Sequence, residues 1–198
     1  MQIDKVEIAE KVCAFAWRDQ QRWDDLRAIF ADGATISVSW FEGSIDKFIE
    51  ASKQMAIAGE AQTKHWFGPP RSVVRGDRAL AETDVMIMIR SRTGPLEVDI
   101  TAYARFVDRF ERDADKGWLI RSRVAVYEKD RMDPVGPSIL IWFLNLIAPY
   151  KKYPPALKHL AFGLSRKGRA LVPGTISSGS VEEQAFLKEA QKWLDKGS

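Results

Sequence analysis

The first sixty positions of the chain carry hydrophobic residues at helical spacing, interrupted by one short alternating segment. Apolar side chains recur every three or four positions over residues 3–17, which predicts an amphipathic helix. A second helix is predicted over residues 20–30, ended by Asp32-Gly33, and a third over residues 45–58. Residues 35–41 alternate between apolar and polar side chains, which predicts a strand.

Beyond residue 59 the hydrophobic period changes to two. The alternating segments are residues 63–75, 78–92, 96–112 and 118–129. Gly68-Pro69-Pro70 predicts a bend within the first segment, and Gly76-Asp77 predicts a hairpin turn after it. Helices that are segregated from a run of hairpin-connected strands predict an α+β fold, with a curved antiparallel sheet packed against three N-terminal helices.

The last two strands are expected to pair around a turn near Asp115, with Tyr103 opposite Tyr127 and Val107 opposite Arg123. This register gives one apolar face and one mixed face. The apolar face would hold Ile100, Ala102, Ala104, Phe106, Phe110, Ile120, Val124 and Val126, and the mixed face Asp99, Thr101, Tyr103, Arg105, Val107, Arg123 and Tyr127. The mixed face would border a pocket or solvent, and a shift of one residue would exchange the faces.

A different pattern begins at residue 133, so we predict a domain over residues 1–132 and a helical C-terminal extension over residues 133–198. Eight of the nine residues 139–147 are apolar, too few to span a bilayer. We expect them to form a helix whose apolar side is hidden over the domain or across a homodimer contact. A peripheral membrane contact is the less favoured alternative, suggested by the basic residues Lys151, Lys152, Lys158, Arg166, Lys167 and Arg169. Ser180-x-x-Glu183 matches a capping box and predicts a final helix.

Composition narrows the functional classes. The 198 residues are 45% hydrophobic and 29% charged, which is ordinary for a globular protein. Cys13 is the single cysteine, so no intrachain disulfide can form, and the two histidines with no ligand cluster predict no metal. No nucleotide-binding glycine motif is present, and we expect no cofactor. A net charge of +3 gives no indication of nucleic acid, and the absence of a secretory signal predicts a cytoplasmic protein.

Three groups of local strings, taken in order, resemble the SnoaL-like family. The first is the segment from Phe15-Ala-Trp-Arg-Asp19 to Asp32. The second is Thr63-Lys-His65-Trp-Phe, followed by Val74-Arg-Gly76-Asp77-Arg-Ala79. The third is the pair of segments 104–110 and 117–123. This family belongs to the superfamily of nuclear transport factor 2, scytalone dehydratase and ketosteroid isomerase, so the resemblance implies a cone-shaped α+β domain over about residues 5–130.

The resemblance also implies an Asp–His pair, Asp19 and His65, in the mouth of the cone. In the family the aspartate orients a histidine, which removes a proton next to a carbonyl or assists the loss of water. The chain departs from the dehydratase-type members at Phe106-Val107, where those members often have Tyr-His. A second catalytic histidine is therefore not expected.

Each candidate residue has a structural alternative. Asp19 precedes a predicted helix and would make a good N-cap, and His65 could be an ordinary strand histidine. Tyr103 and Tyr127 could donate protons to a substrate or simply pack across the strands. Arg123 could bind an anionic or carbonyl group, or could pair with Asp99 or another carboxylate. Trp40 and Trp66, with Phe67, could line a substrate pocket or belong to the core.

Two functions follow as hypotheses. The first is a cofactor-free lyase (dehydratase) or isomerase that acts on a small apolar oxygenated molecule, with His65 as the general base and Asp19 as its orienting partner. The second is a non-catalytic module that binds a hydrophobic ligand or serves dimerisation. A separation of more than about 5 Å between the carboxylate and the imidazole, with no bridging water, would favour the second.

Overall fold

The protein is described by a computed structural model of a single chain, which covers residues 2–59, 62–93, 96–137, 139, 143 and 146–197. The first part contains α1 (Gln2–Cys13), the 3₁₀ helix η1 (Ala14–Arg18), α2 (Trp23–Ala28), β1 (Phe30–Val38), β2 (Phe41–Ser44) and α3 (Ile45–Ile57). The sheet continues with β3 (Gln62–Phe67), β4 (Arg71–Arg75), β5 (Arg78–Thr93), β6 (Leu96–Asp113) and β7 (Gly117–Pro134). The extension adds η2 (Tyr150–Lys152), η3 (Pro155–Leu157), α5 (Lys158–Arg166), β8 (Ile176–Ser177), α6 (Val181–Leu194) and η4 (Asp195–Gly197).

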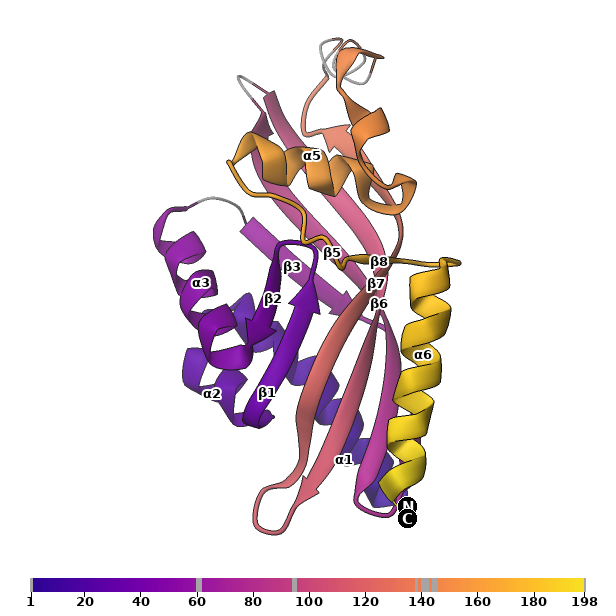
Figure 1. The fold of residues 1–198 in the computed structure, drawn as a ribbon. Coiled ribbons are helices and arrows are strands. Elements are labelled where there is room, and N and C mark those ends of the chain that lie inside the picture. Colours follow the sequence, from indigo (N-terminus) through magenta and orange to yellow (C-terminus); the bar gives the residue numbers. More distant parts are fainter. Residues whose placement is uncertain are drawn as a thin grey trace.

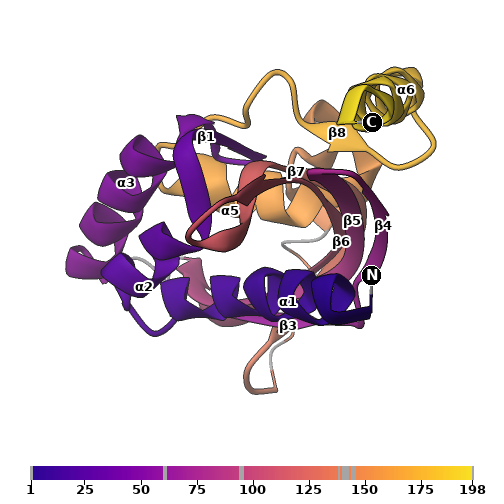
Figure 2. The same cartoon turned by 90° about the horizontal axis from the view of Figure 1, so that it is seen from below.

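One curved sheet organises the molecule. Its strand order is β2-β1-β7-β6-β5-β3, with β4 paired to β5 and β8 paired to β7. Helices α1 to α3 lie on the inner side of the curve and α6 lies on the outer side (Figures 1 and 2). The predicted α+β class, with a curved sheet against three N-terminal helices and a helical C-terminal extension, is confirmed. The sheet is mixed rather than purely antiparallel, because β1 and β8 both run parallel to β7.

The predicted third helix is confirmed as α3, and the second is much shorter than expected. Ser44 caps α3 through its hydroxyl oxygen, which accepts a hydrogen bond from the amide of Lys47. The second helix covers only Trp23–Ala28, and strand β1 already begins at Phe30. Asp32-Gly33 therefore lies inside a strand, where Gly33 adopts a φ of +69° at an irregularity in the pairing with β7.

The predicted pairing of the last two strands is wrong beyond their turn, and two β-bulges are the reason. Phe110 lies opposite Ile120, but a shift in register follows between Arg109 and Phe110. Beyond it, Ala104 lies opposite Tyr127, and Tyr103 lies opposite Lys129 after a second shift. An extra residue in one strand moves its later side chains to the other face. Arg123 and Tyr127 consequently face the helices, whereas Val124 and Val126 face outward.

The extension is connected to both sides of the sheet. On the inner side, Leu157, Leu160 and Leu164 belong to the same hydrophobic core as the helices and β6. Helix α5 lies across the end of the sheet that is opposite to the β6–β7 turn (Figure 1). Its N-terminus is fixed by Asp130 of β7, whose Oδ2 accepts hydrogen bonds from the amides of His159 (2.7 Å) and Leu160 (2.8 Å). The division of the chain at residue 132 stays a prediction.

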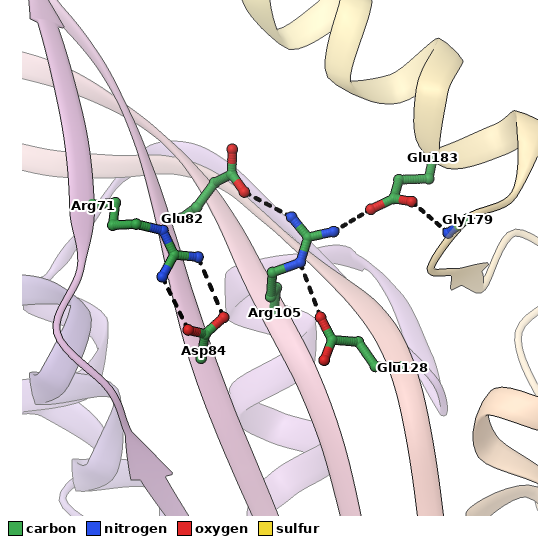
Figure 3. A network of polar contacts seen from close by, with 7 residues as sticks. All are labelled: Arg71, Glu82, Asp84, Arg105, Glu128, Gly179 and Glu183. Atoms are coloured by element: carbon green, nitrogen blue, oxygen red, sulfur yellow. Dashed lines mark hydrogen bonds and ion pairs between the residues drawn. The ribbon is translucent and has the colours of Figure 1, made fainter.

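On the outer side, Arg78, Arg105 and Arg109 of the sheet all donate hydrogen bonds to α6. The guanidinium of Arg105 donates to Glu82 (2.7 Å), to Glu128 (3.0 Å) and to Glu183 of α6 (Figure 3). The hydroxyl oxygen of Ser180 accepts from the amide of Glu183, as the capping box predicts. The carboxylate of Glu183 reaches the amide of Gly179 rather than that of Ser180, so the same side chain closes the cap and binds Arg105.

The apolar run 139–147 is described only at Ile139, Phe143, Leu146 and Ile147, which are helical and exposed in the single chain. The exposure of these four side chains does not test whether the rest of the segment covers the domain, and that placement stays a prediction. The other residues of the run lie outside the described part of the chain. A dimer contact for this segment stays a prediction. Within the described residues, no helix has the length and hydrophobicity needed to cross a membrane.

Candidate active site

Asp19 and His65 lie in direct contact, although 46 positions separate them in the sequence. The Oδ1 atom of Asp19 is 2.8 Å from Nδ1 of His65, and Oδ2 accepts a 2.6 Å hydrogen bond from the backbone amide of the same histidine. Both side chains are buried, with 4% and 7% of their surface exposed. The N-cap alternative for Asp19 is wrong, because the residue ends η1 and gives both of its oxygens to His65.

This contact decides which nitrogen of the imidazole carries the proton. An ionised carboxylate can only accept hydrogen bonds, so the neutral ring must hold its proton on Nδ1. Nε2 then presents a lone pair, and none of the described residues hydrogen-bonds it. Because His65 lines a cavity, this lone pair is available to a bound molecule.

Burial of His65 and the contacts of Asp19 together keep the pair in the charge state that a base needs. Burial lowers the pKa of His65, Asp19 opposes this shift, and the positive charges of Arg18 and Arg123 add to it. Burial alone would raise the pKa of Asp19, but its hydrogen bonds with His65 and the charges of His65 and Arg18 outweigh this effect and lower it. Near neutral pH the pair is therefore an aspartate beside an uncharged imidazole.

Aromatic rings hold the imidazole in place and form the walls of the cavity. Phe15 meets the His65 ring edge-on at 5.6 Å, and Phe67 is stacked at 6.2 Å with an interplanar angle of 16°. Phe106 and Trp40 line the same cavity. The space that the centre of a water molecule can occupy in this cavity is about 80 Å³. Since one water needs about 10–15 Å³ on this measure, there is room for a small molecule.

A tyrosine hydroxyl lies in the same cavity as His65. The Tyr127 oxygen accepts a 3.0 Å hydrogen bond from the backbone amide of Ser39, and both residues line the cavity. Burial raises the pKa of Tyr127, and the hydrogen bond from Ser39 only partly offsets this. The phenol is therefore protonated at neutral pH, and it can donate its proton in a hydrogen bond to an oxygen of a bound molecule.

Three of the predicted substrate-binding residues do not reach this cavity. Tyr103 faces the outer side of the sheet, where Lys129 lies 5.0 Å from its ring. Trp66 alternates with His65 along β3 and is 59% exposed. Arg123 is fully buried beneath Phe15 and Phe106 and pairs with Asp108 through two hydrogen bonds of 2.7 and 2.6 Å. For Arg123 the ion-pair alternative is thus confirmed, with Asp108 rather than Asp99 as partner.

The remaining predictions at the cavity have mixed outcomes. Trp40 and Tyr127 line it as expected. Val107 faces outward and packs with Val126 and Ile176, so no residue at position 107 could serve the site on the inner face. His159 forms a second Asp–His contact, with Asp130 at 3.0 Å, but it does not line the cavity.

Sequence reasoning missed the cationic residues of the cavity. Arg18, Lys167 and Arg169 all line it. Arg18 directly precedes Asp19 in the sequence, and this adjacency to a predicted site residue could have indicated that Arg18 lies near the site. Lys167 and Arg169 belong to the basic segment that suggested a membrane contact, and the fold places both at the cavity. Within the described part of the chain, no cluster of three or more His, Cys, Asp or Glu residues is placed to hold a metal ion.

Comparison with known proteins assigns the family. The family model of the SnoaL-like domain matches residues 3–124, which is more than half of the chain. The chain belongs to the SnoaL-like family. Pea pathogenicity protein 2 of Fusarium vanettenii is 29% identical over 193 residues, covering 91% of this chain and 80% of that protein. This alignment is too long to be confined to residues 3–124, so it includes much of the extension.

Solved structures confirm the fold. A putative scytalone dehydratase from Novosphingobium aromaticivorans matches 70% of this chain and 99% of its own, with a TM-score of 0.55 and 16% identity. A nuclear transport factor 2-like protein from Salmonella enterica matches 69% and 93%, with a TM-score of 0.53 and 15% identity. The superfamily includes dehydratases, isomerases and non-catalytic members, so membership by itself does not define an activity.

Proposed function

We propose that the protein is an acid–base catalyst, a dehydratase or isomerase that needs no cofactor, acting on a small oxygenated molecule with a largely apolar skeleton. The observation that carries this proposal is the 2.8 Å contact between Asp19 and Nδ1 of His65, which leaves Nε2 as an unprotonated base at an aromatic cavity. The contact is far shorter than the separation of about 5 Å that would favour a purely binding role.

In the proposed reaction, Nε2 of His65 removes a proton from a carbon next to a carbonyl group. The electron pair of the broken C–H bond moves into the new C=C bond, and negative charge develops on the carbonyl oxygen. Tyr127 donates a hydrogen bond to this oxygen, while Asp19 stabilises the imidazolium that forms. Isomerisation is completed when His65 returns the proton to another carbon. In dehydration, the carbonyl re-forms, the C=C bond shifts to the α and β carbons, and the C–O bonding pair leaves with the β-hydroxyl oxygen, which takes the proton from His65 and departs as water.

The proton-transfer step can be tested before the natural substrate is identified. Small aryl ketones and β-hydroxy ketones are incubated with the protein in D₂O, and exchange of the α-proton and loss of water are followed by NMR. We expect His65→Gln to slow exchange by about 10²–10⁴-fold. His159→Gln is the matched control, since it removes an imidazole from a second Asp–His contact outside the cavity. Circular dichroism confirms that each variant is folded.

Tyr127→Phe tests the second role. It removes the hydroxyl but keeps the ring, and we expect kcat to fall by about 10²-fold with a smaller change in KM. Equal exchange rates in the wild type and His65→Gln would refute the catalytic role of His65. Tight binding of these ketones without exchange or water loss would favour the non-catalytic ligand-binding alternative.

A further inference from the structure

Arg18 is a largely buried cation at the cavity, and its ion pair with Asp19 is long. Its side chain is 10% exposed, and its guanidinium carbon lies 5.7 Å from the ring centres of both Trp40 and Phe48. The closest carboxylate oxygen, Oδ1 of Asp19, is 3.6 Å from Nη1, which is beyond hydrogen-bonding distance. Among the described residues, this long contact with Asp19 is the only carboxylate contact of the guanidinium.

Arg18 has donors to spare for a ligand. A guanidinium has five N–H donors, and a largely buried charge is stable where acceptor atoms or water complete its hydrogen bonds. Burial lowers the pKa of Arg18, although the neighbouring Asp19 opposes the shift. Asp19 cannot turn toward Arg18 without giving up its hydrogen bonds to His65. Most N–H donors of Arg18 are therefore left for water or for the acceptor oxygens of a ligand.

The charge of the cavity wall favours an anion as the source of those oxygens. Lys167 and Arg169 line the same cavity as Arg18, and the guanidinium of Arg169 is 6.0 Å from the Trp40 ring. Among the described residues that line the cavity, none is an aspartate or glutamate. Cations grouped in a concave, low-dielectric site attract anions.

We propose that the molecule bound beside His65 is a small organic anion, whose carboxylate or phenolate oxygen is held by Arg18. The inference rests on the proposed function, because it names the class of molecule on which His65 would act. The planar fork of a guanidinium matches a carboxylate with two parallel hydrogen bonds. The apolar remainder of the molecule would pack between Phe15, Phe106 and Ile87, which are apolar residues of the cavity wall.

The first experiment compares three probes that fit a small aromatic cavity: benzoate, 4-nitrophenolate and the neutral benzamide. Each is titrated into the ¹⁵N-labelled wild type, and the amide signals of Ser39 and His65 report binding inside the cavity. We expect at least one of the two anions to bind about tenfold or more tightly than benzamide. The anion that binds more tightly identifies the carboxylate or the phenolate as the preferred group.

The second experiment assigns the preference to Arg18. We expect Arg18→Gln to lose it, and Arg18→Lys to keep part of it because the charge remains while the planar fork is lost. Arg22→Gln is the matched control. Arg22 belongs to the same segment, is half exposed and pairs with Asp25 outside the cavity, so its substitution should leave the preference unchanged.

Two results would overturn the inference: equal affinity of the wild type for the anions and benzamide, or an unchanged preference in folded Arg18→Gln. If Arg18→Gln does not fold, the comparison of the three probes on the wild type and on Arg18→Lys decides. Failure of the proposed function is recognised separately. Anion binding through Arg18 without proton exchange would support the inference and refute catalysis. Proton exchange on neutral ketones without any preference for anions would support catalysis and refute the inference.

Discussion

Replacing Asp19 by asparagine should reverse the tautomer of His65 while preserving the shape of the side chain. In Asp19→Asn, the amide oxygen can still accept the hydrogen bond from the backbone amide of His65. The amide NH₂ group then faces Nδ1, where the carboxylate oxygen stood at 2.8 Å. An NH₂ group can only donate, so Nδ1 must give up its proton and Nε2 must carry it. The base that faces the cavity is thereby blocked.

The size of the effect follows from the contacts that change. A hydrogen bond to a charged group contributes about 1.5–3 kcal/mol, and a neutral one about 1 kcal/mol. The variant exchanges one for the other at a buried site, so the free energy of unfolding should fall by about 0.5–2 kcal/mol. The effect on activity is larger, because a wrong-tautomer substitution in a related histidine–aspartate arrangement lowers kcat by about 10⁴.

The assay is ¹⁵N NMR of histidine side chains, in which the chain's two histidines give two ring systems. His159 is an internal reference, since Asp130 contacts its Nδ1 at 3.0 Å in the same way. We expect Asp19→Asn to move the proton of His65 alone, and Asp130→Asn to move that of His159 alone. A His65 ring that keeps its proton on Nδ1 in folded Asp19→Asn would refute the reasoning.

Three further predictions concern stability. Because burial lowers the pKa of His65, the unfolded chain binds a proton below about pH 6.5 that the folded chain does not. The free energy of unfolding, measured by urea titration, should therefore fall as the pH is lowered from about 7 to about 5, and it should fall less steeply in His65→Gln. The same pH dependence in the wild type and in His65→Gln would contradict this. Gly117→Ala should lower the free energy of unfolding by about 1–3 kcal/mol in thermal melts, because the φ of Gly117 is +71° and an added Cβ would displace Glu7. Gly136→Ala is the control: an added Cβ at Gly136 would have no atom within contact distance, so stability should not change. Arg105→Met should speed hydrogen exchange in α6 and leave α1 unaffected, since three carboxylates lose their shared cation. Unchanged exchange would show that the other contacts of α6, including those with Arg78 and Arg109, hold the helix without Arg105.

The order of elements was readable from the sequence because it depends on local patterns. Alternation over residues 78–112 predicts long strands, and these form β5 and β6. Ser44 and Ser180 mark the starts of α3 and α6 through hydrogen bonds to residues three positions away. Asp19 and His65 were indicated by family resemblance, since no local spacing relates residues so far apart.

The tertiary structure alone decided which side chains share the cavity. The two β-bulges leave no recognisable mark in the amino-acid sequence. They nevertheless turned Tyr127 and Arg123 toward the helices and separated Tyr127 from Tyr103. The parallel pairing of β1 with β7 joins distant segments and leaves no mark on either. No local pattern in the sequence indicated that Arg18, Lys167 and Arg169 would meet at one site. They line one cavity because α5 of the extension packs across the end of the sheet, and such long-range packing is set by the whole core.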